Sequence, residues 1–281
     1  MANGVSSEVA SKVLERMRSS LPTPPQFSDK LEERAYLKFR LAQALRIFAK
    51  RGYDEGVAGH ITVRDPIRPN CFWVNPLAFH FKLIQPSDLL LVDAEGNILE
   101  ESGPYRVLNL AAFMIHSRIH EARPDVICAA HSHSLYGKVF AALGIPVDMI
   151  SQDSCAYYND LAIYTQYRGV VQDEEEGTAI AKALGSYKAA ILQNHGLLVA
   201  TDSVEASIYF YITLEKVCQA QLMADAAAAA RNVSTVKIPD NQAAETAKIV
   251  GALRTGWLAG SMEFKLLESE EGVSFKYEPS Q

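Results

Sequence analysis

Apolar positions follow two different periods along the chain. Five segments carry leucine, isoleucine and aromatic residues at helical spacing and are bounded by capping residues, glycine or proline. We predict helices over 29–51, with Ser28 as N-cap residue, and over 109–122, 135–143, 176–184 and 202–231. A further short helix is predicted near 245–254.

Short apolar runs between these helices predict strands. Three runs separated by turns, 60–63, 71–74 and 89–92, predict an antiparallel meander with a hairpin-type turn at 93–97. Wholly apolar runs at 126–130 and 189–192, and a third at 197–200, indicate buried strands. Because helices alternate with strands, we expect a layered α/β domain.

The chain of 281 residues divides into three regions. Residues 1–27 form a polar arm with a proline-rich linker, and 28–231 form the predicted α/β domain. Residues 232–281 form a C-terminal extension without a recognised motif. That extension either covers an active site or wraps an oligomer.

Composition and charge exclude several classes of protein. A net charge of −6 without a basic stripe argues against nucleic acid and anionic membranes as partners. No apolar run reaches the ~18–20 residues of a membrane span, and residues 1–21 lack the apolar core of a signal peptide. The four cysteines form no CxxC pair, which suits a reducing compartment. We therefore expect a cytoplasmic protein.

Three of the seven histidines stand at the ends of apolar strands. His131 and His133 follow 126–130, and residues i and i+2 of an extended segment point to the same side. His195 ends a second apolar strand. If these strands are neighbours, three imidazoles converge as in a catalytic zinc or iron site with an open position. The residues alone leave two interpretations open, a metal site or ordinary surface and core histidines.

A second pair of histidines lies on the predicted helix over 109–122. His116 and His120 are four residues apart and share a helix face. The residues between them lack the glutamate of an HExxH zinc motif. We therefore interpret this pair as structural.

Five motifs in this order resemble the class II aldolase/adducin family: 59–64, 73–76, 122–126, 130–133 and 192–197. The resemblance covers about residues 31–230. It implies a three-layer α/β/α fold around a mixed, largely antiparallel central sheet. It also implies a homo-oligomer, with a tetramer favoured, and active sites between subunits.

The resemblance further implies a metal centre. Metal-dependent members hold zinc or another divalent ion through histidines that match His131, His133 and His195. Zn²⁺ is the favoured ion, with Fe²⁺, Mn²⁺, Ni²⁺ or Co²⁺ as alternatives. Such an ion polarises a carbonyl or enediolate oxygen so that a neighbouring carbon–carbon bond can break.

The chain lacks two sets of residues that the family's sugar-phosphate aldolases carry, the acid/base and the phosphate-binding residues. Their acid/base glutamate falls at Ala112, and their two phosphate-binding serines fall at Leu110 and Ala111. Loss of a general acid/base costs ~10²–10⁴-fold in rate, so a substitute is required. We therefore expect a small non-phosphorylated carbonyl or carboxylate substrate, such as a keto acid or an aromatic acid.

Five residues are candidates for the remaining roles. Asp153 is the first choice for the acid/base and Tyr157 for a proton donor, because relatives bring this stretch toward the metal. His60 stands where relatives bind phosphate, so we expect it to bind a substrate carboxylate or oxyanion. Asn75 and Gln152 are expected to assist in substrate binding.

Three functions compete on this basis. The favoured one is a metal-dependent lyase for aldol, retro-aldol or decarboxylation chemistry, in line with the decarboxylases and secondary-metabolism enzymes of the family. The alternatives are a three-histidine Fe(II) oxygenase and a non-catalytic interaction protein of the adducin type.

Overall fold

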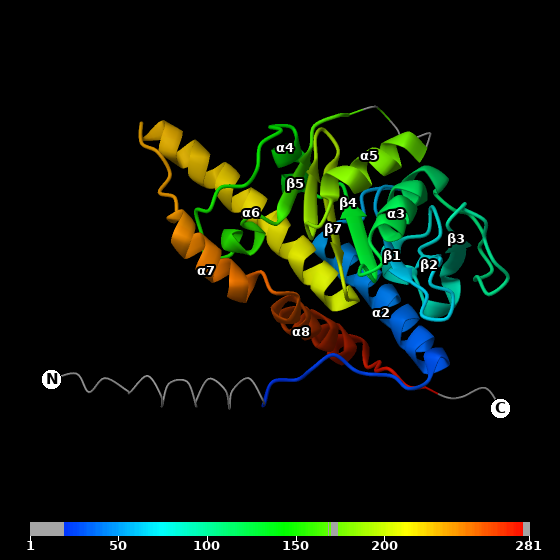
Figure 1. The fold of residues 1–281 in the computed structure, drawn as a ribbon. Coiled ribbons are helices and arrows are strands. Elements are labelled where there is room, and N and C mark those ends of the chain that lie inside the picture. The colour runs from blue at the N-terminus through cyan, green and yellow to red at the C-terminus, as the bar shows by residue number, and fades with distance from the viewer. Residues whose placement is uncertain (1–19, 168, 170–173, 278–281) are drawn as a thin grey trace.

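The computed structural model describes residues 20–167, 169 and 174–277 (Figure 1). Most of the proposed N-terminal arm lies outside the described residues, and the proline-rich segment over 20–25 is exposed. The helices of the described chain are α2 (Lys30–Arg51), α3 (Leu110–Ala122), α4 (Leu135–Ala141), α5 (Glu174–Leu184), α6 (Val204–Ala230), α7 (Asp240–Val250) and α8 (Leu253–Glu271), with short 3₁₀ turns η1 (Phe81–Leu83), η2 (Pro86–Asp88) and η3 (Ser154–Tyr157).

Seven strands of the described chain form one sheet in the order β3-β2-β1-β4-β7-β6-β5. They are β1 (His60–Arg64), β2 (Cys71–Val74), β3 (Leu90–Asp93), β4 (Cys128–Ser132), β5 (Leu161–Tyr164), β6 (Ala189–Leu192) and β7 (Gly196–Thr201). Only β5 and β6 pair in parallel; the other neighbours are antiparallel. The predicted meander and the mixed, largely antiparallel sheet are therefore confirmed.

The period-two alternation of the central strands separates two faces of the sheet. On β4, Cys128 and Ala130 pack into the core formed with α2 and α6, whereas Ala129 packs into the core formed with α3 and α5. The same division holds on β7, where Val199 and Leu198 face opposite cores. Figure 1 shows the resulting three layers, which confirm the predicted α/β/α fold.

The N-cap residue of helix α2 lies one residue later in the chain than predicted. The carboxylate of Asp29, not the hydroxyl of Ser28, accepts the backbone N–H of Leu31. The carboxylate adds a negative charge at the positive end of the helix dipole, which a serine cannot supply. Gly52 ends the helix with φ of 74°, as its position predicted.

The C-terminal extension holds two helices, so the single short helix predicted near 245–254 is wrong. α7 ends at its C-cap residue Gly251, and α8 begins at Leu253. Trp257, Phe264 and Leu267 of α8 join the core that contains α2 and α6. Ion pairs between α2 and α8 flank this contact: Arg40–Glu268, Arg46–Glu271 and Arg51–Glu263. The extension is therefore packed onto the main domain (Figure 1).

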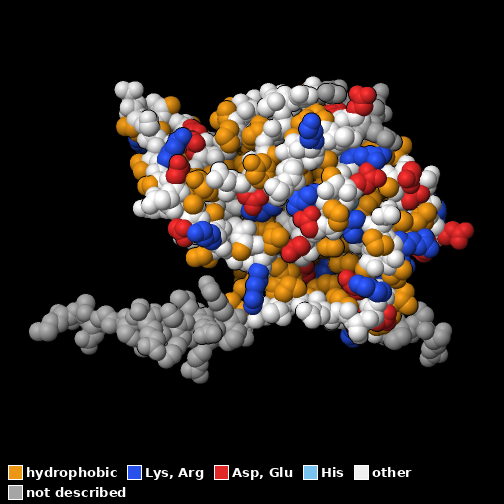
Figure 2. All heavy atoms as spheres, viewed as in Figure 1, with side chains coloured by type: hydrophobic (Ala, Val, Ile, Leu, Met, Phe, Trp, Pro, Cys, Tyr) orange, Lys and Arg blue, Asp and Glu red, His pale blue; other side chains and the backbone are white. Residues whose placement is uncertain are grey.

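The outer surface carries both signs of charge. Figure 2 shows lysine and arginine interspersed with aspartate and glutamate over the visible face. Within the described residues, no helix combines the length and the apolar character needed to cross a membrane.

Candidate metal centre

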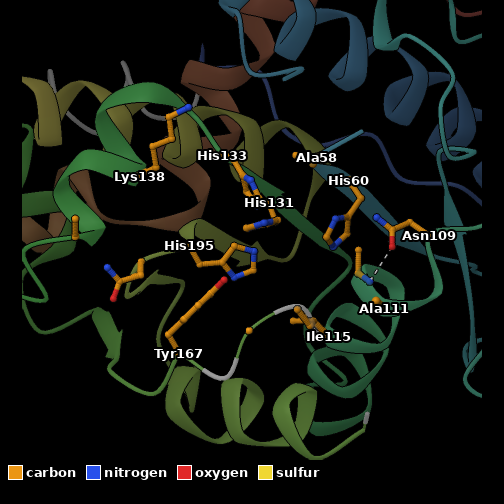
Figure 3. Close-up of a pocket in the computed structure, with 15 residues that line it drawn as sticks. Ala58, His60, Asn109, Ala111, Ile115, His131, His133, Lys138, Tyr167 and His195 are labelled. Atoms are coloured by element: carbon orange, nitrogen blue, oxygen red, sulfur yellow. Dashed lines mark hydrogen bonds between the residues drawn. The ribbon is translucent and has the colours of Figure 1, made fainter. Parts of the chain in front are cut away.

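The ends of two neighbouring strands bring three histidines together. β4 and β7 pair antiparallel, with His131 opposite Leu198. His195 lies in the turn between β6 and β7, and His133 follows β4. The ligand nitrogens of the three histidines lie within 4.8 Å of one another, and Figure 3 shows the rings facing a common space. The imidazoles therefore converge, although the strand before His195, β6, is not the neighbour of β4, because β7 lies between them.

The hydrogen bonding and the charge state of these histidines suit a metal ligand. Nδ1 of His131 donates to the carbonyl of Leu197 at 2.8 Å, because a carbonyl only accepts, and this leaves the Nε2 lone pair free. Burial and the neighbouring histidines hold the pKa of His131 well below 6.5. Burial, followed by the effect of His133, lowers the pKa of His195 to about 4. The three residues thus fit a divalent ion, which binds neutral imidazole.

The turn before β7 permits a close approach of the backbone to these rings. Asn194 adopts a left-handed conformation with φ of 57°. A Cβ at Gly196 would lie 2.6 Å from the carbonyl oxygen of Ser132, so only glycine fits there without a backbone shift. Gly196 therefore sets the spacing between the β4 end and the His195 turn.

Buried polar groups on α6 fix the segment that carries His133. The hydroxyl of Tyr211 donates to the carbonyl of Ser132 at 2.9 Å. The carboxylate of Glu215 accepts from the Ser134 hydroxyl and from the backbone N–H groups of Tyr136 and Gly137. Glu215 therefore caps α4 from another helix, and the N-cap residue of α4, Ser134, directly follows His133.

We expect replacement of Glu215 by alanine to lower stability and weaken the metal site together. The change leaves two backbone N–H groups and one hydroxyl without their partner, which costs about 2–3 kcal/mol of unfolding free energy. Loss of a group that orients a ligand typically costs ~10–100-fold in metal affinity. Urea unfolding and zinc titration measure both effects. The matched control is Lys216→Ala, an exposed neighbour on α6; equal behaviour of the two variants would contradict this role.

A cavity of about 500 Å³ opens beside the three histidines. One wall is the start of α3, where Ala111, Ala112 and Ile115 present small or apolar side chains (Figure 3). Asn109 caps that helix by accepting the N–H of Ala112 at 3.3 Å. The other described lining residues are Ala58, Gly59, His60, Lys138, Ala142, Tyr167, Gly169 and Asn194. The cavity therefore combines an apolar wall with a polar, histidine-rich floor.

Comparison with known proteins identifies the family. Residues 39–222 match the model described as class II aldolase and adducin N-terminal domain. The chain belongs to the class II aldolase and adducin family. Class II aldolases generally depend on a divalent metal, act on small molecules and often form oligomers. The matched residues lie inside the domain predicted over 28–231.

Two relatives and one solved structure cover most of the chain. The 4-hydroxy-3-prenylphenylpyruvate oxygenase/4-hydroxy-3-prenylbenzoate synthase of Streptomyces roseochromogenus subsp. oscitans is 41% identical over 235 residues, 83% of this chain and 82% of that protein. Decarboxylase NovR of Streptomyces niveus is 40% identical over 235 residues, 83% and 84% of the two chains. The structure named L-fuculose 1-phosphate aldolase from Glaciozyma antarctica PI12 is 45% identical, with a TM-score of 0.81 over 89% of this chain and 95% of that one. These names support a lyase type of function for this aldolase-family chain.

The fold places two of the predicted substrate-binding residues near the histidines. His60 lines the cavity, and its Cα pairs with that of His131 across β1 and β4. Asn75 lines a small adjoining pocket that shares His60, and its side-chain oxygen accepts the backbone N–H of Ile61. Ala111 and Ala112, the positions that depart from the sugar-phosphate aldolases, also line the cavity.

The other three predicted residues do not line this cavity within one chain. Gln152 and Asp153 are exposed. The buried hydroxyl of Tyr157 donates to the carbonyl of Phe210 at 2.5 Å. A role for Asp153 as acid/base therefore requires that a second subunit brings it to a neighbour's cavity, and it stays a prediction.

Four polar lining residues escaped the sequence reasoning: Asn109, Lys138, Tyr167 and Asn194. Asn109 carried a recognisable signal, because an asparagine before an apolar helical run is a favoured N-cap. Lys138 reaches the cavity from α4 and pairs with Glu55 at 2.5 Å, a contact 83 residues apart that no local pattern indicates. Tyr167 follows β5, and Figure 3 shows its hydroxyl end directed toward His195.

Proposed function

We propose that this chain is a metal-dependent carbon–carbon lyase for a non-phosphorylated keto acid that carries an apolar or aromatic group. Three neutral imidazoles that open onto a cavity with an alanine-lined wall are the observation that carries this proposal. His131, His133 and His195 would hold the ion, and the wall of Ala111 and Ala112 would contact the apolar part of the substrate.

The lining favours a substrate without phosphate. The serine pair and glutamate of the sugar-phosphate aldolases are replaced by groups that neither bind phosphate nor transfer a proton, and Ala111 and Ala112 place methyl groups in the cavity. Among the described lining residues, Lys138 is the one lysine or arginine, and its ammonium already pairs with Glu55. A sugar phosphate therefore lacks the partners that its charge requires.

The bond that breaks must lie one carbon away from the polarised carbonyl. When bound, the divalent ion supplies Lewis-acid stabilisation of the enolate that forms. In retro-aldol cleavage of a 4-hydroxy-2-oxo acid, the C3–C4 bond breaks, its electron pair becomes the enolate, and the 4-hydroxyl proton passes to an acceptor as the aldehyde leaves. In decarboxylation of a 3-oxo acid, carbon dioxide leaves instead. The apolar side chains of the α3 wall offer neither enolate a proton donor.

A second candidate function is oxidative. The 41% identical relative is named as an oxygenase for a substituted phenylpyruvate, and three imidazoles also suit Fe(II). In that function, dioxygen is the oxidant and an arylpyruvate is the substrate.

One set of assays tests the proposal and separates the two candidates. Zinc-loaded and iron(II)-loaded protein is incubated with 4-hydroxy-2-oxo acids, 3-oxo acids and arylpyruvates, in air and in anaerobic buffer. Release of aldehyde or carbon dioxide without oxygen supports the lyase. Turnover of arylpyruvates that needs both iron and oxygen supports the oxygenase. Absence of turnover in every combination would contradict both functions.

Assembly as a tetramer and a cytoplasmic location stay separate predictions, which these assays do not test.

A further inference from the structure

The side-chain amide of Asn109 is fixed in one orientation at the edge of the cavity beside the three histidines. Asn109 directly precedes α3, and its side-chain oxygen accepts the backbone N–H of Ala112 at 3.3 Å, as the N-cap of the helix. A backbone N–H only donates, so the amide atom that it contacts is the oxygen and not the nitrogen. The capping bond therefore decides on which side of the amide the two N–H hydrogens lie.

The nitrogen of this amide is a donor without a partner. Within the described residues, Nδ2 of Asn109 donates to no acceptor. It differs from the ring nitrogens of His60, because it is not one of the fully buried atoms that lack a partner and so keeps accessible surface. Figure 3 shows the amide between His60 and the start of α3, with its nitrogen on the His60 side. Asn109 thus has two N–H hydrogens available to a ligand.

The size of the neighbouring spaces decides from where a ligand reaches this amide. Asn75 is oriented in the same way, since its side-chain oxygen accepts the backbone N–H of Ile61 at 3.2 Å. Asn75 lines only the adjoining pocket, whose volume of about 20 Å³ has room for about one water molecule. Asn109 lines that pocket and also the cavity of about 500 Å³. Of these two amides, Asn109 is therefore the one within reach of a substrate in the large cavity.

The surroundings of Asn109 favour a negatively charged acceptor next to an apolar group. No aspartate or glutamate is among the described residues that line the cavity, so no carboxylate of the lining repels an anion. Asn109 also stands at the N-terminus of the 13-residue helix α3, where the helix dipole is positive. The methyl groups of Ala111 and Ala112 lie on the same wall. A ligand that carries a carboxylate beside an apolar group matches this arrangement, since hydrogen bonds to charged acceptors are the stronger ones.

We propose that Asn109 is a specificity-determining residue whose amide N–H groups bind the carboxylate of a keto acid in the cavity beside the three histidines. The choice of a keto acid as the ligand rests on the proposed function. The capping bond of α3 persists when the ligand binds, because the oxygen of the amide caps the helix and the nitrogen binds the carboxylate. The substrate carboxylate thereby has a partner in the chain itself.

Two substitutions separate the donor from the cap. Asn109→Asp has nearly the same size and caps a helix as well as asparagine does, but its ionised carboxylate donates no hydrogen bond and repels an anion. Asn109→Ser also retains a capping side chain and adds no charge, but it lacks the amide donor. Asn241→Asp, at an exposed position of α7, is the matched control for the charge. Urea unfolding should show a folded protein of similar stability in each case.

Calorimetric titration of zinc-loaded protein measures the preference for a carboxylate. The ligands are phenylpyruvate and phenylacetone, in which a methyl group replaces the carboxylate. The wild type is expected to bind phenylpyruvate more tightly, and zinc contributes equally to this preference in every variant. The preference should fall roughly ten- to hundredfold in Asn109→Asp and about tenfold in Asn109→Ser, the value of a hydrogen bond to a charged group, and stay unchanged in Asn241→Asp.

Three results would overturn the role of Asn109. They are a wild type without a preference, an unchanged preference in Asn109→Asp, and a preference that falls in Asn109→Asp but not in Asn109→Ser, which would mean that the added charge alone acts. Turnover of keto acids combined with one of these results would leave the lyase standing. A reduced preference in both Asn109 variants, without turnover of any keto acid, would leave the binding role standing and contradict the lyase.

Discussion

We expect simultaneous replacement of His131 and His133 by alanine to abolish divalent-metal binding and any activity that depends on it. The two residues supply two of three converging ligand nitrogens. Because removal of a group that merely orients a ligand costs ~10–100-fold in metal affinity, loss of two direct ligands costs more than ~10²-fold. Elemental analysis by mass spectrometry of untagged protein, after incubation with Zn²⁺ or Fe²⁺, measures the loss.

The matched control for this variant is His80→Ala. Its ring is largely exposed on the meander side of the molecule, and it is not among the converging histidines. This control should retain the wild-type metal content, and circular dichroism should show an intact fold for both proteins. Metal that persists in the double variant would show that the ions bind elsewhere. A wild type that takes up no ion at all would favour the non-catalytic, adducin-like alternative.

The convergence of the three histidines was predicted from local patterns and one assumption. The apolar runs that became β4 and β6 end at His131 and near His195, and period two places His131 and His133 on one side. The assumption was that the strands before these histidines are neighbours in the sheet. That assumption was wrong, because β7 lies between β4 and β6. The histidines converge instead because β7, which directly follows the His195 turn, pairs with β4.

Features that depend on distant contacts were missed. α8 is stabilised by burial of Trp257 and Phe264 against residues of other helices, and its many polar positions masked this apolar stripe. β5 is a four-residue edge strand whose register with β6 is set by a long crossover. Lys138 reaches the cavity because Glu215 anchors α4, 77 residues away in sequence. Such contacts have no periodic signature in the chain.

The contacts of His116 and His120 could not be predicted from the sequence, because they depend on which face of the sheet α3 covers. Their spacing of four residues was visible, and so was the alternation that puts His60 and Thr62 on one face of β1. What the sequence did not contain was that α3 covers this face. Once it does, the hydroxyl of Thr62 lies within hydrogen-bond distance of both helix histidines, and the pair joins a buried network.

The same buried histidines predict that the metal-free protein loses stability steeply as the pH falls below about 6.5. Burial lowers the pKa of His120 to about 3, and burial also holds the pKa values of His60, His116 and His131 well below 6.5. The ordinary histidine pKa of about 6.5 applies in the unfolded chain, whereas the folded protein has the lower values. Between them, the unfolded chain binds more protons than the folded protein, so that stability rises with pH. Each group contributes up to about 1.4 kcal/mol per pH unit, and four of them reach about 5.6 kcal/mol per unit.

Urea unfolding in the presence of a chelator, at pH values from 8 to about 5, measures this slope. A domain stability of about 5–15 kcal/mol would be exhausted within one to three pH units below 6.5. His120→Gln keeps a donor and an acceptor at this position but cannot be protonated, so the slope between about pH 6 and 5 should fall by about 1.4 kcal/mol per unit. Asp125→Asn is the matched control, because the Arg123 guanidinium lowers the pKa of this carboxyl below 3.8 and its effect appears only in stronger acid. A stability that stays constant from pH 7 to 5 would mean that these histidines become protonated within the folded protein. Their burial opposes this, and so does the Arg64 guanidinium beside His120, so such a result would contradict the prediction.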